Sequence, residues 1–538
     1  MANESIKAKP YIKFRRITTL PCITDLNETV PEGGQPSYTW PDLFAERPST
    51  YTEEERALFS ADVVPVFSFS SQTPFSEWFK KLSEEKTRFV VQTKLNELSS
   101  EEHARWVATI EEFIGYRCRL RLLRTDPLPP IEFWVNLASS DVLPFGTEHP
   151  GKLLPLEGSN LAKMDGKKFQ EAVMEMLFGQ RTMPEGFENE REFTIATNRF
   201  KIGDQVEVLN RANPSEVRPA IVKDIRCGRM YLVLKMIYMK ANSADDSDDL
   251  QRTLGIYLNQ DSPLIFPVGW AMQACYPINA DASYREHCSQ ILEDTVIQVA
   301  PNYGANDSTP QNFVSADGFK HKGNWREGDA LEVLDPIDKK FQSLCVAHVK
   351  RVCYNGYLEL VFEKTSDTIP LHPSSPNLFP PGYAKTYGIK LETPKQKPGR
   401  KFDWDTYFKE NVGLRLRPNA SMFRADTVEN LEERFKIGAK LEAADQVDAR
   451  RPLCPATVKA HKGRLLLISF DGWSSEYDQL YHVESSELSP VGWSEMNGLY
   501  LHHPNISDKD SSRKRRGITP KRSRGAPKRH RGKRSGAS

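Results

Sequence analysis

The C-terminal end of the chain carries the densest group of residues with an evident chemistry, a run of basic side chains. Between Arg513 and Arg534 the sequence has twelve Lys or Arg residues and no Asp or Glu. Gly and Pro interrupt this run, so we expect residues 505–538 to form a disordered tail. Such clusters are typical of nuclear import signals and of nonspecific contacts with nucleic-acid phosphates, although they can also simply aid solubility. The candidates for these roles are Arg513, Lys514, Arg515, Arg516, Lys521, Arg522 and Arg524.

The rest of the chain is acidic. Of the 73 Lys and Arg residues, 61 lie outside this run, against 72 Asp and Glu, which gives the body a net charge of −11. An acidic body suits basic partners and argues against a body that itself grips DNA. The 538 residues predict three or four domains, and a hydrophobic content of 39% excludes a wholly disordered chain. No apolar run predicts a transmembrane helix, and we expect neither membrane contact nor a secretory signal.

Cysteine and histidine spacing gives no support for a metal site or for catalysis. None of the eight cysteines forms a C-x-x-C pair, and the eleven histidines show no metal or triad spacing. Sparse cysteines are typical of a reducing compartment. We found no P-loop, dinucleotide fingerprint, nucleophile elbow or H-E-x-x-H motif. These absences do not exclude an enzyme, but they leave no catalytic residue to nominate and make a structural zinc site unexpected.

Three short markers recur four times in the same order and define the elements that position any site. A Pro-x-Gly turn occurs at Pro144, Pro267, Pro380 and Pro490. It follows an upstream marker that we place at Asn96, Glu207, Glu332 and Glu442. The intervals are 48, 60, 48 and 48 residues, and the longer one contains the polar insertion Lys240–Gln251. An alanine lies between each pair of markers, at Ala108, Ala220, Ala347 and Ala456. Internal repetition of this kind indicates an array of similar units.

Each unit has a β pattern preceded by a helical stretch. In the last unit, apolar runs on either side of His461–Gly463 predict a hairpin, and several short strands per unit suggest small barrels. Helical patterns at Phe169–Phe178 and Trp404–Lys409 predict arms that pack on a neighbouring barrel. We expect an N-terminal segment at 1–34, units at 35–157, 167–282, 283–395 and 401–504, and the tail at 505–538.

The last unit resembles a malignant brain tumour (MBT) repeat. The resemblance rests on KLEAAD at Lys440–Asp445, SFDGW at Ser469–Trp473, Tyr477, SPVGW at Ser489–Trp493 and a preceding FDW at Phe402–Trp404. Four such units, covering about residues 35–504, resemble the four-MBT chromatin repressors. The resemblance implies a mainly β fold with helical arms: four tandem MBT repeats, each a small Tudor-like barrel with an extended arm that packs on a neighbouring repeat.

The resemblance also implies a reader of methylated lysine, not an enzyme, and a chain that needs no cofactor. Family members hold mono- or dimethyl-lysine in an aromatic cage closed by one acidic residue. Phe470, Trp473 and Tyr477 fall on the cage aromatics, Asp445 on the acid, and Asp448 where the family usually has Asn. Aromatic faces attract a methylammonium by cation–π interaction. A carboxylate accepts a charge-assisted hydrogen bond from a remaining N–H, which trimethyl-lysine lacks.

The other units depart from the cage pattern. In the third, Asp335 and Phe362 remain, but Thr365 replaces the Trp and Ile369 stands near the Tyr position. In the second, Asn210 takes the Asp position and Lys235–Tyr238 replaces FDGW. In the first, Ser99 takes the Asp position and Leu123–Asp126 replaces FDGW. We expect these three units to be structural or to bind other partners, and Trp270 and Trp493 of the PVGW segments to be packing residues.

These patterns favour a nuclear chromatin reader that binds methylated histone H3 or H4 tails through the fourth unit and acts in transcriptional repression with chromatin repressor proteins. Two alternatives stay open. The chain could be a scaffold of a repressor complex without essential methyl-lysine binding, or a nucleic-acid-binding protein that works through its tail.

Overall fold

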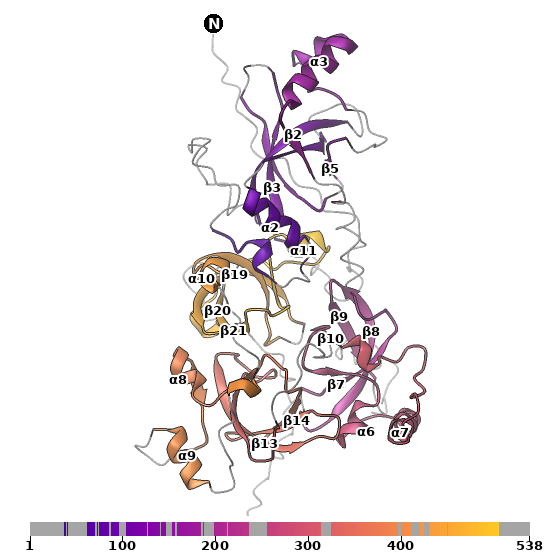
Figure 1. Ribbon diagram of the computed structural model, residues 1–538, viewed down its shortest axis with the longest axis vertical. Helices are drawn as coiled ribbons and strands as arrows, with labels where there is room; N and C mark the ends of the chain where they lie inside the picture. The colour runs from indigo at the N-terminus through magenta and orange to yellow at the C-terminus, as the bar shows by residue number, and fades with distance from the viewer. Residues whose placement is uncertain are drawn as a thin grey trace, which may run out of the picture.

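Four curved β-sheets form the framework of the computed structural model, with short helices between them (Figure 1). Within the described residues, no helix is long and apolar enough to cross a bilayer, and no group of His, Cys, Asp and Glu could hold a metal. The structure describes residues 37–38, 40, 62–69, 73, 75–85, 88–95, 104–125, 127, 129–139, 141–146, 153–156, 159–183, 187, 198–211, 213–235, 255–313, 324–395, 401–411, 420–423, 430–448 and 450–504.

The first two sheets contain eleven strands. The strands of the first sheet are β1 (Phe89–Lys94), β2 (Arg105–Ile114), β3 (Arg117–Leu122), β4 (Glu132–Asn136), β5 (Val142–Pro144) and β6 (Arg181–Thr182). Those of the second sheet are β7 (Gln205–Leu209), β8 (Val217–Arg226), β9 (Arg229–Leu234), β10 (Gly255–Asn259) and β11 (Ile265–Phe266).

The third and fourth sheets repeat this arrangement. The strands of the third are β12 (Ala330–Val333), β13 (Ser343–Val352), β14 (Leu358–Phe362), β15 (Thr368–Leu371), β16 (Leu378–Phe379) and β17 (Lys390–Glu392). Those of the fourth are β18 (Lys440–Ala444), β19 (Leu453–Lys462), β20 (Leu465–Phe470), β21 (Gln479–His482) and β22 (Leu488–Ser489).

The four sheets share one topology. In each, the fourth, third, second, first and fifth strands lie side by side in that order, and all these pairs are antiparallel. The long second strand carries an irregularity in every sheet, between Ile110 and Glu112, Val222 and Asp224, Val349 and Arg351, and Val458 and Ala460. A bulge bends a strand and increases its twist, which curls a short sheet toward a barrel.

Strand register confirms two of the three repeated markers and corrects the third. Ala108, Ala220, Ala347 and Ala456 all lie opposite the residue before the buried polar marker on the first strand. In the second, third and fourth sheets that marker is Glu207, Glu332 and Glu442. In the first sheet it is Gln92, which pairs with Leu143 directly before Pro144. The assignment to Asn96 was wrong by four residues, because a polar Gln stands where the other units have Glu.

The marker glutamates are buried carboxylates that bind the Pro-x-Gly turn. Glu442 accepts the N–H of Gly492 and of Ser494, both at 2.8 Å. Glu332 accepts the backbone N–H groups of Gly382 and Ala384, both at 2.7 Å. Glu207 accepts the backbone N–H groups of Gly269 and Ala271. Each turn glycine has a positive φ of 84–95°, so the turn needs glycine there. The helices α6 (Trp270–Ala274), α8 (Tyr383–Tyr387) and α11 (Trp493–Met496) begin directly after these glycines.

The same carboxylates receive a donor from the arm of the following unit. Trp404, the first residue of α9 (Trp404–Glu410), donates its indole N–H to Glu332 at 2.8 Å. Tyr284 of α7 (Ala282–Val296) donates its hydroxyl to Glu207 in the same way, with the hydroxyl and carboxylate oxygens 3.4 Å apart. Arms therefore pack on the preceding sheet, as the sequence predicts. The start of the first unit packs on the fourth sheet instead, since Trp40 donates its indole N–H to Glu442 at 2.9 Å.

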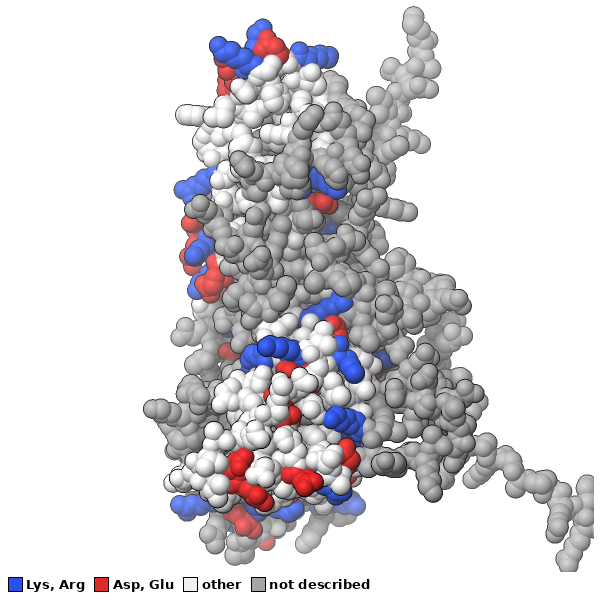
Figure 2. Space-filling view, turned by 90° about the vertical axis from the view of Figure 1, so that its right-hand side faces the viewer, with Lys and Arg blue, Asp and Glu red and all other residues white. Residues whose placement is uncertain are grey.

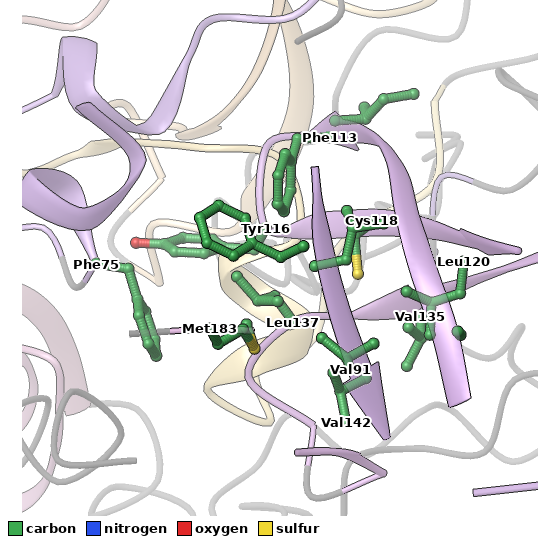
Figure 3. Packing of buried hydrophobic residues seen from close by; sticks show 14 of the residues in the cluster. Phe75, Val91, Phe113, Tyr116, Cys118, Leu120, Val135, Leu137, Val142 and Met183 are labelled. Carbon is green, nitrogen blue, oxygen red and sulfur yellow. The ribbon is translucent and has the colours of Figure 1, made fainter. Parts of the chain in front are cut away.

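The remaining helices complete these contacts. Phe169 of α3 (Gly166–Leu177) packs against Trp106 of the first sheet, with ring centroids 6.0 Å apart. The helix α2 (Ser76–Glu85) covers the first sheet with Trp78 and Phe79, and α10 (Leu431–Arg434) precedes β18. Phe75 and Tyr116 meet Leu137 and Met183 in this core (Figure 3).

Hairpin tips join the units. The β2–β3 tip packs on the fourth sheet, where Tyr116 donates its N–H to the Val491 carbonyl at 2.8 Å. The β19–β20 tip packs on the third, where Arg464 lies over the Phe379 ring, 4.2 Å from its centroid. The β13–β14 tip packs on the second, where Tyr357 meets Trp270. The first sheet lies at one end of the molecule, above the fourth, with the second and third below (Figure 1).

Candidate functional site

Asp445 is a buried carboxylate at the end of β18. Its side chain is among the buried polar groups, at 1% exposure, and its backbone N–H donates to the Pro452 carbonyl at 2.9 Å. Its Oδ1 accepts the Gln479 amide at 2.6 Å and the Val447 N–H at 3.0 Å. A buried carboxylate needs such donors, since an unsatisfied charge in the interior is costly.

Gln479 is in turn held by its own partners. Its Oε1 accepts the Gln446 N–H at 3.0 Å and the Tyr481 hydroxyl at 2.9 Å. Tyr481 also donates to the Ala444 carbonyl at 2.7 Å. The acid is therefore fixed by a buried polar network that joins β18 to β21. The sequence motifs do not include Gln479, Gln446 or Tyr481, and the one hint is the polar Gln at the start of β21.

Phe470, Trp473 and Tyr477 lie together where β20 turns into the next loop. Phe470 ends the strand and is 2% exposed, whereas Trp473 and Tyr477 are half-buried. The Trp473 and Tyr477 rings meet edge to face, with centroids 5.2 Å apart and planes at 74°. The backbone N–H of Trp473 donates to the Phe470 carbonyl at 3.1 Å, and Tyr477 ends a short 3₁₀ helix at Ser475–Tyr477. Gln479, the donor to Asp445, follows Tyr477 by two residues, and Trp473 packs against the core cluster that contains Phe470 and Tyr481.

Asp448 has a different setting. Its carboxylate oxygens accept the Arg450 N–H at 2.9 Å and pair with the Arg450 guanidinium at 3.0 Å. The side chain is 32% exposed and Arg450 is 70% exposed, so solvent screens this pair. Asp448 therefore shapes the loop after Asp445.

A cation from the second sheet lies beside this loop. Arg211 donates to the Gln446 carbonyl at 3.2 Å. Burial lowers the pKa of Arg211 to about 10, and the positive charge of Arg451 acts in the same direction. The carboxylates of Asp335, Asp448 and Asp445 oppose this shift. Arg229 of the same sheet donates to the Arg451 carbonyl at 2.6 Å. The loop that carries Asp445 is thus supported from outside its own sheet.

Comparison with known proteins decides the family. The model of the MBT repeat matches residues 204–285, 329–398 and 439–507, which hold the second, third and fourth sheets. Protein lin-61 of Caenorhabditis elegans is 30% identical over 426 residues, covering 74% of this chain and 67% of the relative. The chain belongs to the MBT-repeat family.

Other relatives agree with this assignment. Polycomb protein Sfmbt of Drosophila pseudoobscura pseudoobscura is 32% identical over 409 residues, 74% of this chain and 30% of that protein. A crystal structure of the four MBT repeats of Drosophila melanogaster Sfmbt, in complex with a peptide RHR(me)KVLR, matches with a TM-score of 0.68 and 28% identity. It covers 87% of this chain and 99% of that one. The four sheets are therefore the barrels of MBT repeats 1 to 4.

MBT repeat 3 retains the acid without the cage. Phe362 pairs with Ala347 as Phe470 pairs with Ala456, which puts the exposed Thr365 at the Trp position, as the sequence predicts. The Tyr position falls on Asp367; Ile369 instead corresponds to Gln479. Asp335 consequently lacks the amide donor. Burial raises its pKa to about 7, with further contributions from Asp338 and Asp367.

MBT repeats 1 and 2 depart further, and strand register moves their equivalent positions. Leu122 and Leu234 pair with the marker alanines, so they take the Phe470 place, one residue before the predicted Leu123 and Lys235. The buried Leu95 takes the Asp445 place, because it lies three residues after Gln92; the predicted Ser99 lies outside the described residues. Asn210 does take this place in repeat 2, and its amide donates to Glu216 at 2.8 Å.

Two further predictions concern other parts of the chain. Trp270 and Trp493 are 2% and 7% exposed and lie in core clusters, as expected of packing residues. The basic tail with Arg513–Arg516 and Lys521–Arg524 lies outside the described residues.

Proposed function

We propose that the chain is a nuclear chromatin reader that acts in transcriptional repression and binds mono- or dimethyl-lysine of histone H3 or H4 tails in the cage of MBT repeat 4. Asp445, Phe470, Trp473 and Tyr477 would form the cage, with Asp448 as a loop residue beside it. The edge-to-face pair of Trp473 and Tyr477, in the segment that leads directly to the Asp445 donor Gln479, carries the proposal. The methylated peptide in the Sfmbt complex and the Polycomb name of that relative support it.

The chemistry of these side chains suits the lower methyl states. Each aromatic contact with a desolvated cation contributes about 0.5–2 kcal/mol. Asp445 would add a charge-assisted hydrogen bond to a remaining N–H of about 1.5–3 kcal/mol, which trimethyl-lysine cannot give. Unmodified lysine is better hydrated and fills such a cage poorly. No covalent step is involved, which suits a binding protein.

Binding through one side chain should be weak, because ordering a flexible tail offsets part of the contact energy. A second contact would raise occupancy. The basic tail could supply it through nucleic-acid phosphates. On the face in Figure 2, by contrast, the coloured Lys and Arg side chains are interspersed with Asp and Glu, which favours the tail over the body for such a role.

The test is a calorimetric titration of the full chain with histone peptides in the four methyl states, with a chain ending at Ser512 in parallel. Asp445→Asn keeps the shape and one acceptor but removes the charge, so affinity for the dimethyl peptide should fall tenfold or more, which corresponds to about 1.4 kcal/mol. Asp335→Asn, the same change in repeat 3, is the matched control and should bind as the unmodified chain does.

Equal affinity for all methyl states would contradict the cage mechanism. No binding in any state by the folded chain would instead favour the second candidate, a scaffold of a repressor complex, for which the inter-repeat hairpin contacts and the acidic body provide the basis.

A further inference from the structure

The aromatic half of the cage in MBT repeat 4 is held by a residue of MBT repeat 3. The side-chain amide of Gln342 donates to the Glu476 carbonyl at 2.8 Å and to the Asp478 carbonyl at 2.9 Å, and it lies 3.4 Å from the Ser475 carbonyl. These carbonyls lie on both sides of Tyr477. One half-buried amide thus bridges the whole turn that carries the tyrosine.

The backbone next to Gln342 is fixed in place. Phe341 is buried and has a φ of +54°, a conformation that a bulky residue adopts only when its surroundings enforce it. The Asp338 side chain accepts the Phe341 N–H at 2.6 Å. The Phe341 carbonyl accepts the Leu480 N–H at 2.7 Å, on the outer side of the edge strand β21. The segment therefore docks on repeat 4 through backbone as well as side chain.

Other contacts of this turn come from repeat 4 itself. Lys459 pairs with the Asp478 carboxylate, the Trp473 and Tyr477 rings meet edge to face, and Tyr477 donates its backbone N–H to the Ser474 carbonyl at 3.0 Å. Ser474, Ser475 and Glu476 are nevertheless exposed, and ordering an exposed turn upon binding lowers affinity. A donor that bridges the carbonyls of Ser475, Glu476 and Asp478 removes part of that penalty in advance.

We propose that Gln342 is a positioning residue for the cage, so that methyl-lysine recognition by repeat 4 depends on repeat 3. The proposal rests on the proposed function, since the cage is the site that it prepares. It follows that the reader is a unit of at least two repeats. Replacement of repeat 3 by a different repeat would alter the cage without changing any residue that contacts the ligand.

The test uses the full chain with Gln342→Met, which keeps the side-chain length but removes the donor and adds no charge. Gln290→Met is the control: Gln290 is an exposed amide on α7 that also makes a hydrogen bond, to Asp294 at 3.2 Å. Gln342→Lys restores donors at the same site and should recover part of the effect. Hydrogen exchange of the 473–479 amides is read by mass spectrometry, and a dimethyl-lysine histone peptide is titrated in parallel.

Gln342→Met should speed exchange at residues 473–479 and not elsewhere, leave the unfolding midpoint unchanged, and weaken peptide binding about tenfold. Unchanged exchange and unchanged affinity in this variant would overturn the role of Gln342. Failure of the unmodified chain to bind any methylated peptide is a separate result that overturns the proposed function, because the exchange readout needs no ligand.

Discussion

Gly115 offers a sharp test of how the MBT repeats join. It lies at the tip of the β2–β3 hairpin with a φ of +61°, directly against the Pro-Val-Gly turn of repeat 4. A Cβ added there would lie 2.8 Å from the Val491 Cβ and 2.9 Å from its carbonyl carbon, with the carbonyl oxygen nearer still. Gly115→Ala therefore forces the hairpin away from the turn and disturbs the hydrogen bond from Tyr116 to Val491.

The magnitude follows from three separable effects. The left-handed backbone costs a non-glycine residue about 1–2 kcal/mol. Overpacking of a close contact adds about 1–3 kcal/mol, and the weakened hydrogen bond about 1 kcal/mol. Gly115→Ala should thus lower the free energy of unfolding by about 3–6 kcal/mol. Gly356 sits at the β13–β14 tip with a φ of +84° and no atom within 4 Å of an added Cβ, so Gly356→Ala should show the backbone effect alone.

The assay is urea unfolding of the full chain, followed by intrinsic fluorescence, with the two variants compared at equal protein concentration. We expect the free energy of unfolding, obtained as the midpoint multiplied by the slope, to fall by about 2–4 kcal/mol more for Gly115→Ala than for Gly356→Ala. Gly463→Ala should resemble the former, since its added Cβ would lie 2.9 Å from ring carbons of Tyr383 and Tyr387. Equal losses for Gly115 and Gly356 would refute the packing argument.

Two other predictions concern the buried carboxylates. Trp404→Phe keeps an aromatic ring but removes the 2.8 Å hydrogen bond to Glu332, so thermal or urea unfolding should show a loss of about 1–3 kcal/mol, and Phe402→Leu, which removes no hydrogen-bond donor, should show less. Burial raises the pKa of Glu207 and Glu442 to about 7 from 4.5, so the folded state binds protons more tightly than the unfolded state. Their contribution to stability is present below pH 4.5 and is lost as the pH rises toward 7, and Glu442→Gln should flatten this part of the pH profile; an unchanged profile would contradict the assignment.

The repeat architecture could be predicted because the marker residues make the same structural contacts in each repeat. Glu207, Glu332 and Glu442 must satisfy the turn that follows the proline, and only glycine fits the turn itself. The small alanine must lie opposite the first strand. In repeat 1 the polar marker is Gln92, and the interval from this marker to Pro144 is longer than the corresponding interval in repeats 3 and 4. The matching interval from Asn96 was a coincidence, because spacing carries no information about which side chain is buried.

The site could be predicted only in part. Phe470, Trp473 and Tyr477 are close in sequence, so local spacing reveals them. The residues that support the Tyr477 turn and the Asp445 loop come from elsewhere in the chain. Gln342 binds the Asp478 carbonyl across 136 positions, and Arg211 binds the Gln446 carbonyl across 235. Neither stands in a motif, because a single amide or guanidinium that binds a backbone carbonyl imposes no pattern on its neighbours in sequence.

The docking of the arms explains why the repeats should be studied together. The Trp404 indole from the arm of repeat 4 bonds the carboxylate of repeat 3, and Trp40, 402 positions before Glu442, bonds that of repeat 4. A cut between two repeats separates a buried carboxylate from one of its donors, and breaking one partner of a buried charge costs more than the intact contact contributes. An isolated repeat 4 would lose both the Trp40 donor and the Gln342 amide beside its cage. Weak binding by such a fragment would then reflect a disturbed barrel and a loosened turn, and only variants in the full chain can separate the cage from its supports.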